Sequence, residues 1–440
     1  MLLVRHGSAA DPAGQEGLAA LTADMLDEGS GNRSAIELHE ALAGIGARLD
    51  IDLGSDAALV SVTALSRFAD RALTLLADMV ARPALTEADF TRVRQLRLHR
   101  LTQLRDMPGF VADRTFVKLL YGRHPYGHTP IGGERSLSAL TVDDVRTFYA
   151  RAVRPWAATL VAVGDCDHAG IERMAGEAFA GWEGVPVAQA LRPANAGLTA
   201  SAEATAVRRS TRRRRPRATV EDSLLNAGPG EVARLTIVPR PGAPQSELRI
   251  GHVAVARNTP DYHALVVANT VLGGQFVSRI NLNLREDKGF TYGARTGFDF
   301  RRWPGPFVLQ VSVQTAATGR AIEESRGEIA AIRGPRPVTE EELALAVATL
   351  TRGYARNFET AEQIGRAVTQ LALYDLPDEH FVEFVPRVER ITTDEVTRVA
   401  TEHIDPARLV TLVVGDVDRV GRDLKQLGLD DPVVLSPDAF

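Results

Sequence analysis

An internal repeat constrains this chain more than any other feature of its sequence. The stretch from Leu140 to Asp167 aligns without gaps on the stretch from Ile391 to Asp418, at an offset of 251 residues and with eight identical residues in 28 positions. A second block, Leu85-Thr86-Glu87, matches Val338-Thr339-Glu340 at nearly the same offset. Because two separate blocks recur at nearly the same offset, chance similarity of short α/β units is a poor explanation. The chain is therefore predicted to consist of two homologous halves.

Each copy of the repeat describes the same structural unit. A threonine (Thr141 or Thr392) followed three residues later by an acidic residue is typical of a helix N-cap, a proline then breaks the chain, and an apolar strand ends at Gly-Asp. The segment 307–314 alternates apolar and polar residues, which predicts a strand with one wet face. A strand is also predicted over 58–65, and helices over 17–28, 68–82, 86–105, 339–354 and 361–374. The predicted fold class is α+β, in which each half is a mostly antiparallel sheet with helices packed on one face.

The predicted domain boundaries follow from composition. Residues 1–190 form the N-terminal half, residues 231–440 the C-terminal half, and residues 191–230 a linker rich in Ala, Pro, Gly and Arg. The arginine run from Arg208 to Arg217 could contact nucleic acid or an acidic surface. A solvated, mobile linker is the favoured interpretation, because no aromatic residue interrupts the run and the formal net charge of the chain is -5. That charge also argues against nucleic acid or a membrane as the main partner.

Composition excludes several other classes of protein. A single cysteine, Cys166, rules out an internal disulfide and a cysteine-based structural zinc site. No apolar run approaches the roughly 20 residues that span a bilayer. The first residues lack the long apolar core of a signal peptide, so the sequence as it stands indicates a cytoplasmic protein. A periplasmic location is expected instead if the true start lies upstream.

The stretch from Leu272 to Phe298 combines three kinds of structure. Gly273-Gly274 predicts a break, and an apolar face of Val277, Ile280 and Leu284 then predicts a helix. Lys288-Gly289 is typical of a helix C-terminus. Alternation then predicts a half-buried strand in which Phe290, Tyr292 and Ala294 share one face. Arg285 is thus expected near the end of the helix and Tyr292 just inside the returning strand.

Arg285 and Tyr292 can be interpreted in two ways. A guanidinium and a phenol that face one cleft are donors suited to a peptide carbonyl, or to the oxyanion that forms when the carbonyl is attacked. Alternatively, Arg285 is a solvated helix residue and Tyr292 is a core aromatic on the same face as Phe290. Pattern alone favours the second interpretation.

A resemblance to a known family reverses this preference. The two-half layout, the block from Val271 to Ala294, the phrase His124-Pro125-Tyr126-Gly127 and the Val-Gly-Asp phrases resemble the pitrilysin/insulinase family of metallopeptidases, in particular its bacterial, mitochondrial-processing-peptidase-like branch. The resemblance covers nearly the whole chain except the linker. It implies that Arg285 and Tyr292 hold a peptide substrate and stabilise the tetrahedral intermediate at a zinc site in another half.

The zinc motif of that family is degenerate here. Active members carry H-x-x-E-H on a helix after a Gly-Leu-Ala phrase, with a further glutamate as third ligand. In this chain Ala20, Ala23 and Asp24 stand at the positions of the first histidine, the glutamate and the second histidine, and residues 91–113 contain no glutamate. No other histidine pair on a helix carries a glutamate between its members. Only 16 residues precede Gly17, so the first half is expected to have a smaller sheet unless the start is internal.

The resemblance predicts the non-zinc subunit of a heterodimeric zinc metalloendopeptidase, inactive alone. Such a chain binds no metal itself. It supplies Arg285 and Tyr292 to a homologous zinc-bearing subunit, and the substrate is a peptide or an unfolded protein. Two alternatives stay open at this point: a structural or assembly subunit, and a peptide-binding homodimer without peptidase activity.

Overall fold

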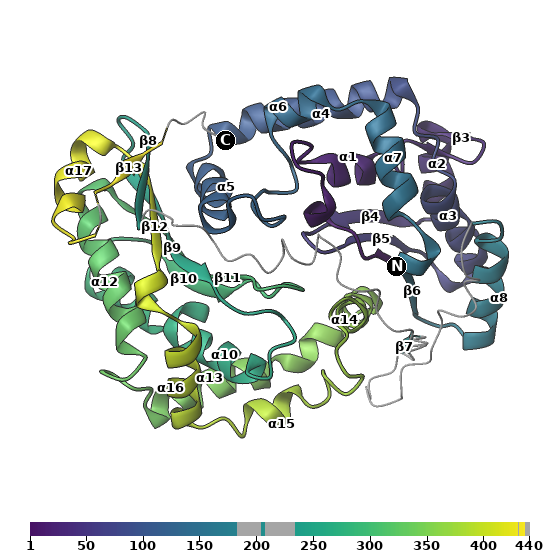
Figure 1. The fold of residues 1–440 in the computed structure, drawn as a ribbon. Coiled ribbons are helices and arrows are strands. Elements are labelled where there is room, and N and C mark those ends of the chain that lie inside the picture. The colour runs from purple at the N-terminus through teal and green to yellow at the C-terminus, as the bar shows by residue number, and fades with distance from the viewer. Residues whose placement is uncertain (183–203, 207–233, 430, 436–440) are drawn as a thin grey trace, which may run out of the picture. The chain divides into compact units, whose positions relative to one another are not determined.

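The computed structural model describes residues 1–182, 204–206, 234–429 and 431–435. The chain forms two compact units (Figure 1). Unit 1 comprises the described parts of Met1–Gln103, His128–Asp222 and Ala355–Val382, and unit 2 those of Leu104–Gly127, Ser223–Tyr354 and Glu383–Phe440. Both units have the predicted α+β class. Among the helices of the described residues, none has the length and apolar character needed to cross a membrane.

Unit 1 is built on an antiparallel sheet with the strand order β4-β5-β1-β6-β7. A two-stranded hairpin, β2-β3, lies outside this sheet. The strands are β1 (Leu2–Val4), β2 (Gly29–Ser30), β3 (Arg33–Ser34), β4 (Arg48–Leu53), β5 (Ala58–Thr63), β6 (Ala158–Val163) and β7 (Ala204–Ala206). The helices are α1 (Leu18–Asp24), α2 (Ala35–Ala43), α3 (Ala69–Ala81), most of α4 (Glu87–Arg105), α6 (Glu134–Ala139), α7 (Val142–Ala152), α8 (His168–Ala178) and α14 (Ala361–Tyr374).

Unit 2 is built on a sheet with the strand order β10-β11-β9-β12-β8-β13. The pairs from β10 to β12 are antiparallel, and β8 pairs in parallel with both β12 and β13. The strands are β8 (Leu235–Pro239), β9 (Gln245–Val253), β10 (Ala294–Phe298), β11 (Pro306–Gln314), β12 (Val410–Gly415) and β13 (Val433–Val434). The helices are α5 (Pro108–Tyr121), α10 (Tyr262–Asn269), α11 (Arg279–Asn281), α12 (Thr318–Ala331), α13 (Glu340–Arg352), α15 (Phe384–Val388), α16 (Thr393–His403) and α17 (Val417–Lys425).

The structure confirms the sequence repeat. Helices α7 and α16 begin one residue after Thr141 and Thr392, whose side chains accept hydrogen bonds from the backbone N–H groups of Asp144 and Glu395. Each helix leads through a proline-containing 3-10 turn into a strand, β6 in unit 1 and β12 in unit 2. The same local signals therefore build the same element order twice.

Alternation along β11 separates the two faces of the unit 2 sheet. The side chains of Phe307, Leu309, Val311 and Val313 are buried in the hydrophobic core with residues of α10, α12 and α16. Val308, Gln310 and Ser312 are only half-buried, and Gln314 is exposed. The predicted wet face is confirmed, and it is the face that carries the candidate site.

The two units exchange one helix each relative to the two sequence halves. Helix α5 lies in the N-terminal half of the sequence but packs on β9 and β12 in unit 2. Helix α14 lies in the C-terminal half but packs on β6 in unit 1, where Val161 contacts Ile364 and Val368. Each sheet therefore carries a helix on its second face, in addition to the helices predicted for one face (Figure 1).

The stretch predicted as a linker is described only in part. Ala204–Ala206 forms β7, which pairs antiparallel with β6. This short strand adds ordered structure to a stretch that was predicted to be a mobile linker throughout. The rest of residues 191–230, including the arginine run from Arg208 to Arg217, lies outside the described residues.

Candidate functional site

The segment that carries Arg285 and Tyr292 packs tightly against the edge of the unit 2 sheet. Helix α10 continues into a π-helical segment, η5 (Thr270–Gly274). The η5 segment packs against β10. A Cβ atom on Gly273 would lie 2.5 Å from Thr296 Oγ1 and 2.7 Å from its backbone nitrogen. Only glycine fits this close approach, so the predicted break has a packing cause as well as a conformational one.

The helix predicted after this break is present but starts later than predicted. It comprises α11 and a second π-helical segment, η6 (Leu282–Asp287). Ile280 and Leu284 are fully buried, as the apolar face requires. Val277 is exposed, because the chain becomes helical only at Arg279, and its assignment to that face is wrong. Gly289, with φ of 64°, leaves the helix at the predicted position.

The guanidinium of Arg285 projects from η6 and is held mainly by an aromatic ring. Its Cζ atom lies 4.3 Å from the centroid of the Phe276 ring, within cation–π distance. Its Nε atom lies 3.5 Å from Glu286 Oε1, a looser ion pair. Phe276 is itself exposed. Arg285 is thus near the end of the helix, as predicted, and retains donors that a ligand could use.

Tyr292 is not a core residue. Its side chain is 91% exposed, and it precedes β10, which begins at Ala294 instead of Phe290. The hydroxyl of Thr291 accepts a hydrogen bond from Gly293 N (3.1 Å) and donates to Ser312 O (2.7 Å). This local turn replaces the strand ladder and directs the phenol outward, while Phe290 stays buried. The interpretation of Tyr292 as a core aromatic on the same face as Phe290 is therefore wrong.

Asn281 connects the two segments that carry the candidate residues. Its side chain is buried, and its Nδ2 donates to Phe276 O at 2.6 Å. Its Oδ1 accepts from Ala294 N at 3.0 Å. One amide therefore ties the loop under Arg285 to the start of the strand that follows Tyr292. No sequence pattern singles out this residue, because an isolated asparagine in a helix belongs to no motif.

Arg285 and Tyr292 line one cavity of about 510 Å³ in unit 2. Its other lining side chains come from β9, the turn after η5, α11, β10 and β11: Glu247, Arg249, Gln275, Phe276, Asn281, Ala294, Arg295, Gln310, Val311 and Ser312. The two donors predicted to face one cleft do so within a single unit. Whether they act on a substrate stays a prediction.

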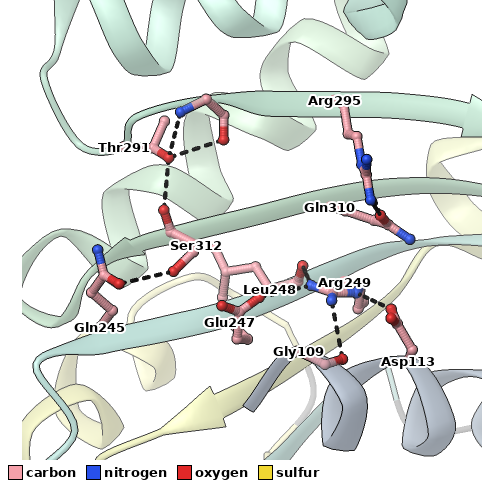
Figure 2. A network of polar contacts seen from close by, with 11 residues as sticks. Gly109, Asp113, Gln245, Glu247, Leu248, Arg249, Thr291, Arg295, Gln310 and Ser312 are labelled. Carbon is pink, nitrogen blue, oxygen red and sulfur yellow. Dashed lines mark hydrogen bonds and ion pairs between the residues drawn. The ribbon is translucent and has the colours of Figure 1, made fainter. Parts of the chain in front are cut away.

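The floor of this cavity is a polar network that also fastens α5 to the sheet (Figure 2). Arg249 is 5% exposed, and its Nε donates to Asp113 Oδ1 on α5 at 2.7 Å. Its Nη1 and Nη2 atoms donate to Glu247 Oε2 (3.1 Å), Leu248 O (2.9 Å) and Gly109 O (3.2 Å). The role of Arg249 could not be predicted from the sequence, since no pattern shows that α5 covers this strand.

The degenerate motif positions line a different cavity, of about 870 Å³ in unit 1. Ala20 and Ala23 are 3% and 5% exposed on α1, and the carboxylate of Asp24 is bound by Arg97 of α4, with Nε 2.5 Å from Oδ2. Zinc needs nitrogen, sulfur or carboxylate ligands. Two methyl groups and a carboxylate already paired with a guanidinium do not fit a zinc ion.

One cluster of potential metal ligands occurs elsewhere among the described residues. Asp261, Glu402 and His403 bring one ligand atom each within 4.8 Å of one another. Arg398 also binds Asp261, with Nη2 2.8 Å from Oδ1, and holds the pKa of that carboxyl below its usual value. The ion pair with Arg398 already neutralises the Asp261 carboxylate. None of the three residues lines the cavity of Arg285.

Comparisons with known proteins bear on the whole chain. Residues 1–127 match a family model described as "Insulinase (Peptidase family M16)", and residues 139–350 match one described as "Peptidase M16 inactive domain". An uncharacterized zinc protease of Mycobacterium tuberculosis is 24% identical over 413 residues, which cover 93% of this chain and 86% of the relative. A protein of Helicobacter pylori named "Non-peptidase homolog YmxG" is 24% identical over 150 residues, or 34% of this chain and 35% of the relative.

Two solved structures share the fold. A peptidase M16 inactive domain from Pseudomonas fluorescens has a TM-score of 0.80 at 23% identity, covering 94% of this chain and 92% of that one. A protease from Helicobacter pylori has a TM-score of 0.77 at 16% identity, covering 94% of this chain and 93% of that one. At these identities the structures establish the architecture alone.

Proposed function

This chain belongs to the insulinase family of peptidases (M16), and on that premise we propose that it is the non-metal subunit of a heterodimeric zinc metalloendopeptidase. It pairs with a homologous chain that carries an intact H-x-x-E-H motif. Its own contribution is the pair of donors in unit 2, Arg285 and Tyr292. The substrate is a peptide or an unfolded protein.

One contrast carries this proposal. The unit 2 cavity presents a guanidinium and an exposed phenol, while the motif positions that line the unit 1 cavity are Ala20, Ala23 and Asp24, whose carboxylate is bound to Arg97. A 91% exposed tyrosine beside a cavity buries very little apolar area, so packing does not explain its position. A role in contacting another molecule does.

Arg285 and Tyr292 have distinct tasks in the proposed reaction. The phenol O–H donates one hydrogen bond to the carbonyl oxygen of the scissile peptide, and this bond strengthens as negative charge develops on that oxygen. The guanidinium binds the same oxygen or the next carbonyl along the peptide, and its positive charge favours the charged state. Phe276 keeps the guanidinium oriented without neutralising it. Zinc on the partner supplies the activated water.

Substitution of either donor tests the proposal. Loss of one oxyanion donor typically costs about 10²–10³ in rate, so Arg285→Ala and Tyr292→Phe should each lower kcat of the mixed complex by roughly that factor. Peptide hydrolysis is measured on this chain mixed with a candidate zinc-bearing chain. Arg419→Ala is the matched control, because Arg419 is an exposed arginine on α17 that does not line the cavity.

The outcomes separate the proposal from its alternatives. If both variants support hydrolysis at the wild-type rate in the mixed complex, the assigned roles are wrong. A structural subunit would form the complex without contributing to the rate. A peptide-binding homodimer would bind peptide and show a mass of two copies without any zinc-bearing chain.

A further inference from the structure

Three side chains cross the floor of the unit 2 cavity in one row (Figure 2). The strand register places Arg295 of β10 opposite Gln310 of β11, and Gln310 opposite Arg249 of β9. Directly opposite residues on antiparallel strands present their side chains on the same face, about 5 Å apart. The row therefore sets two guanidinium groups on either side of one amide.

The two arginines of this row differ in what neutralises them. Arg249 is buried and is bound by the carboxylates of Asp113 and Glu247. Arg295 is exposed, and its Nε and Nη2 atoms donate to Gln310 Oε1 at 3.0 and 2.8 Å. Within the described part of the chain, no carboxylate oxygen lies within 4.0 Å of the Arg295 guanidinium. A guanidinium has five N–H donors, so three remain for a ligand.

Gln310 adds donors at the same place. Its Oε1 is occupied by Arg295, which orients its Nε2 as a donor, and no residue of the described ranges accepts from that atom. Glu247 is the one carboxylate in the cavity lining, and it is engaged by Arg249. Asp113 and Glu247 together exceed the charge of Arg249 by one, so an anion is favoured at the β10 end of the row and disfavoured at the β9 end.

We infer that Arg295 and Gln310 form a subsite for a carboxylate of the bound peptide. This inference rests on the proposed function, since it names the kind of peptide that the cavity selects. The carboxylate is either the side chain of Asp or Glu or the C-terminal carboxylate of the peptide. A planar guanidinium with free N–H groups is the side chain best matched to two carboxylate oxygens.

Peptide binding to this chain alone tests the inference. Fluorescein-labelled peptides are compared in matched pairs by fluorescence anisotropy: Glu against Gln at each position in turn, and a C-terminal acid against its amide. In at least one pair the anionic member should bind about fivefold more tightly, the size expected for a partly solvated charge-assisted contact. The ratio should fall as NaCl rises from 50 to 500 mM. The pair that responds identifies the source of the carboxylate.

Substitutions at Arg295 locate the effect. Arg295→Ala should abolish the preference, and Arg295→Glu should reverse it in favour of a matched Lys peptide. Because Arg295 is exposed on an edge strand, both variants should fold, which a thermal melt verifies. Arg419→Ala removes the same charge outside the cavity and should leave the ratio unchanged. Equal affinities in every pair, no binding by either member, or a preference that survives Arg295→Ala would overturn the inference.

Failure of the inference and failure of the proposed function give different results. If Arg285→Ala lowers kcat of the mixed complex while the two members of every peptide pair bind equally, the subsite is wrong and the function stands. If a preference for the anionic member of any pair depends on Arg295 but Arg285→Ala and Tyr292→Phe leave kcat unchanged, the subsite stands and the catalytic roles are wrong.

Discussion

The cavities of unit 1 and unit 2 differ in their lining residues, although each is bordered by a helix with a well-buried apolar face. In unit 1, α1 is buried through Leu18 and Leu21, yet its cavity-lining positions hold two alanines and Asp24, whose carboxylate is paired with Arg97. In unit 2, the helix that carries Arg285 is buried through Ile280 and Leu284, and its cavity keeps a full set of donors. A helix needs only its apolar face to stay in place. Its polar face can lose a ligand set without any change of architecture.

The largest expected effect comes from restoring metal ligands in unit 1. Ala20→His, Ala23→Glu, Asp24→His and Arg97→Glu together place two imidazoles and two carboxylates where α1 faces α4. We expect about one zinc per chain after dialysis, with Kd below about 1 µM. Metal analysis by mass spectrometry measures this. A triple variant that keeps Arg97 should bind at least about 100-fold more weakly, because the guanidinium faces the site. A quadruple variant that folds but binds no zinc would show that unit 1 lacks more of a metal site than the ligand side chains.

A second test compares the ion pairs under the two cavities. Arg249 is buried among partners in unit 2, and its removal leaves two carboxylates without a cation. Arg249→Met should lower the free energy of unfolding by about 3 kcal/mol. The Asp24 carboxylate in unit 1 is 41% exposed, so Arg97→Met should cost less than about 1 kcal/mol. Urea unfolding measures both changes. Equal losses in the free energy of unfolding would show that the two ion pairs contribute equally to stability.

The third test asks whether Asn281 positions the donors of unit 2. Asn281→Ala removes the hydrogen bonds to Phe276 O and Ala294 N and should lower kcat of the mixed complex about tenfold with little change in KM. Asn281→Asp keeps the acceptor for Ala294 N and should recover part of this loss. A variant that melts at a lower temperature but retains full kcat would make Asn281 a purely structural residue.

The smallest effect expected is a pH dependence confined to unit 2. Burial, followed by the nearby Arg387 and Arg257, lowers the pKa of His263 to about 4. The unfolded chain takes up this proton near pH 6.5, before the folded chain does, so stability should fall as pH decreases from about 6.5 to about 4. The loss should be at most about 1.4 kcal/mol per pH unit, the slope that uptake of a single proton gives. Thermal melts of wild type and His263→Gln measure it, and an identical slope in both would contradict the assignment.

Local signals in the sequence predicted much of this molecule. The capping threonines Thr141 and Thr392 fixed the starts of α7 and α16, and alternation along β11 identified its buried face. The position of Arg285 near a helix end also followed from the pattern. These features depend on neighbours a few residues away, which periodicity and capping report directly.

Features that depend on distant neighbours were not predictable in the same way. The alternation of apolar residues continues through Tyr292, but the hydroxyl of Thr291 bonds to Ser312 across the sheet and ends the regular pairing there. The helix predicted over 361–374 is present as α14, but its pattern did not say which sheet it would cover, and no helix was predicted at α5. The buried Arg249 became intelligible only once α5 was placed on β9.

The exchange of α5 and α14 makes the two sequence halves interdependent for folding. A fragment ending between the halves would carry α5 without the strands it covers, and a bare sheet face without α14. The gene could not be divided there into two separately folding products, although the sequence repeats on either side of that point. Proteolysis between the halves would instead leave two fragments that stay associated through the packing of α5 and α14. The fragments would separate only when both sheets unfold.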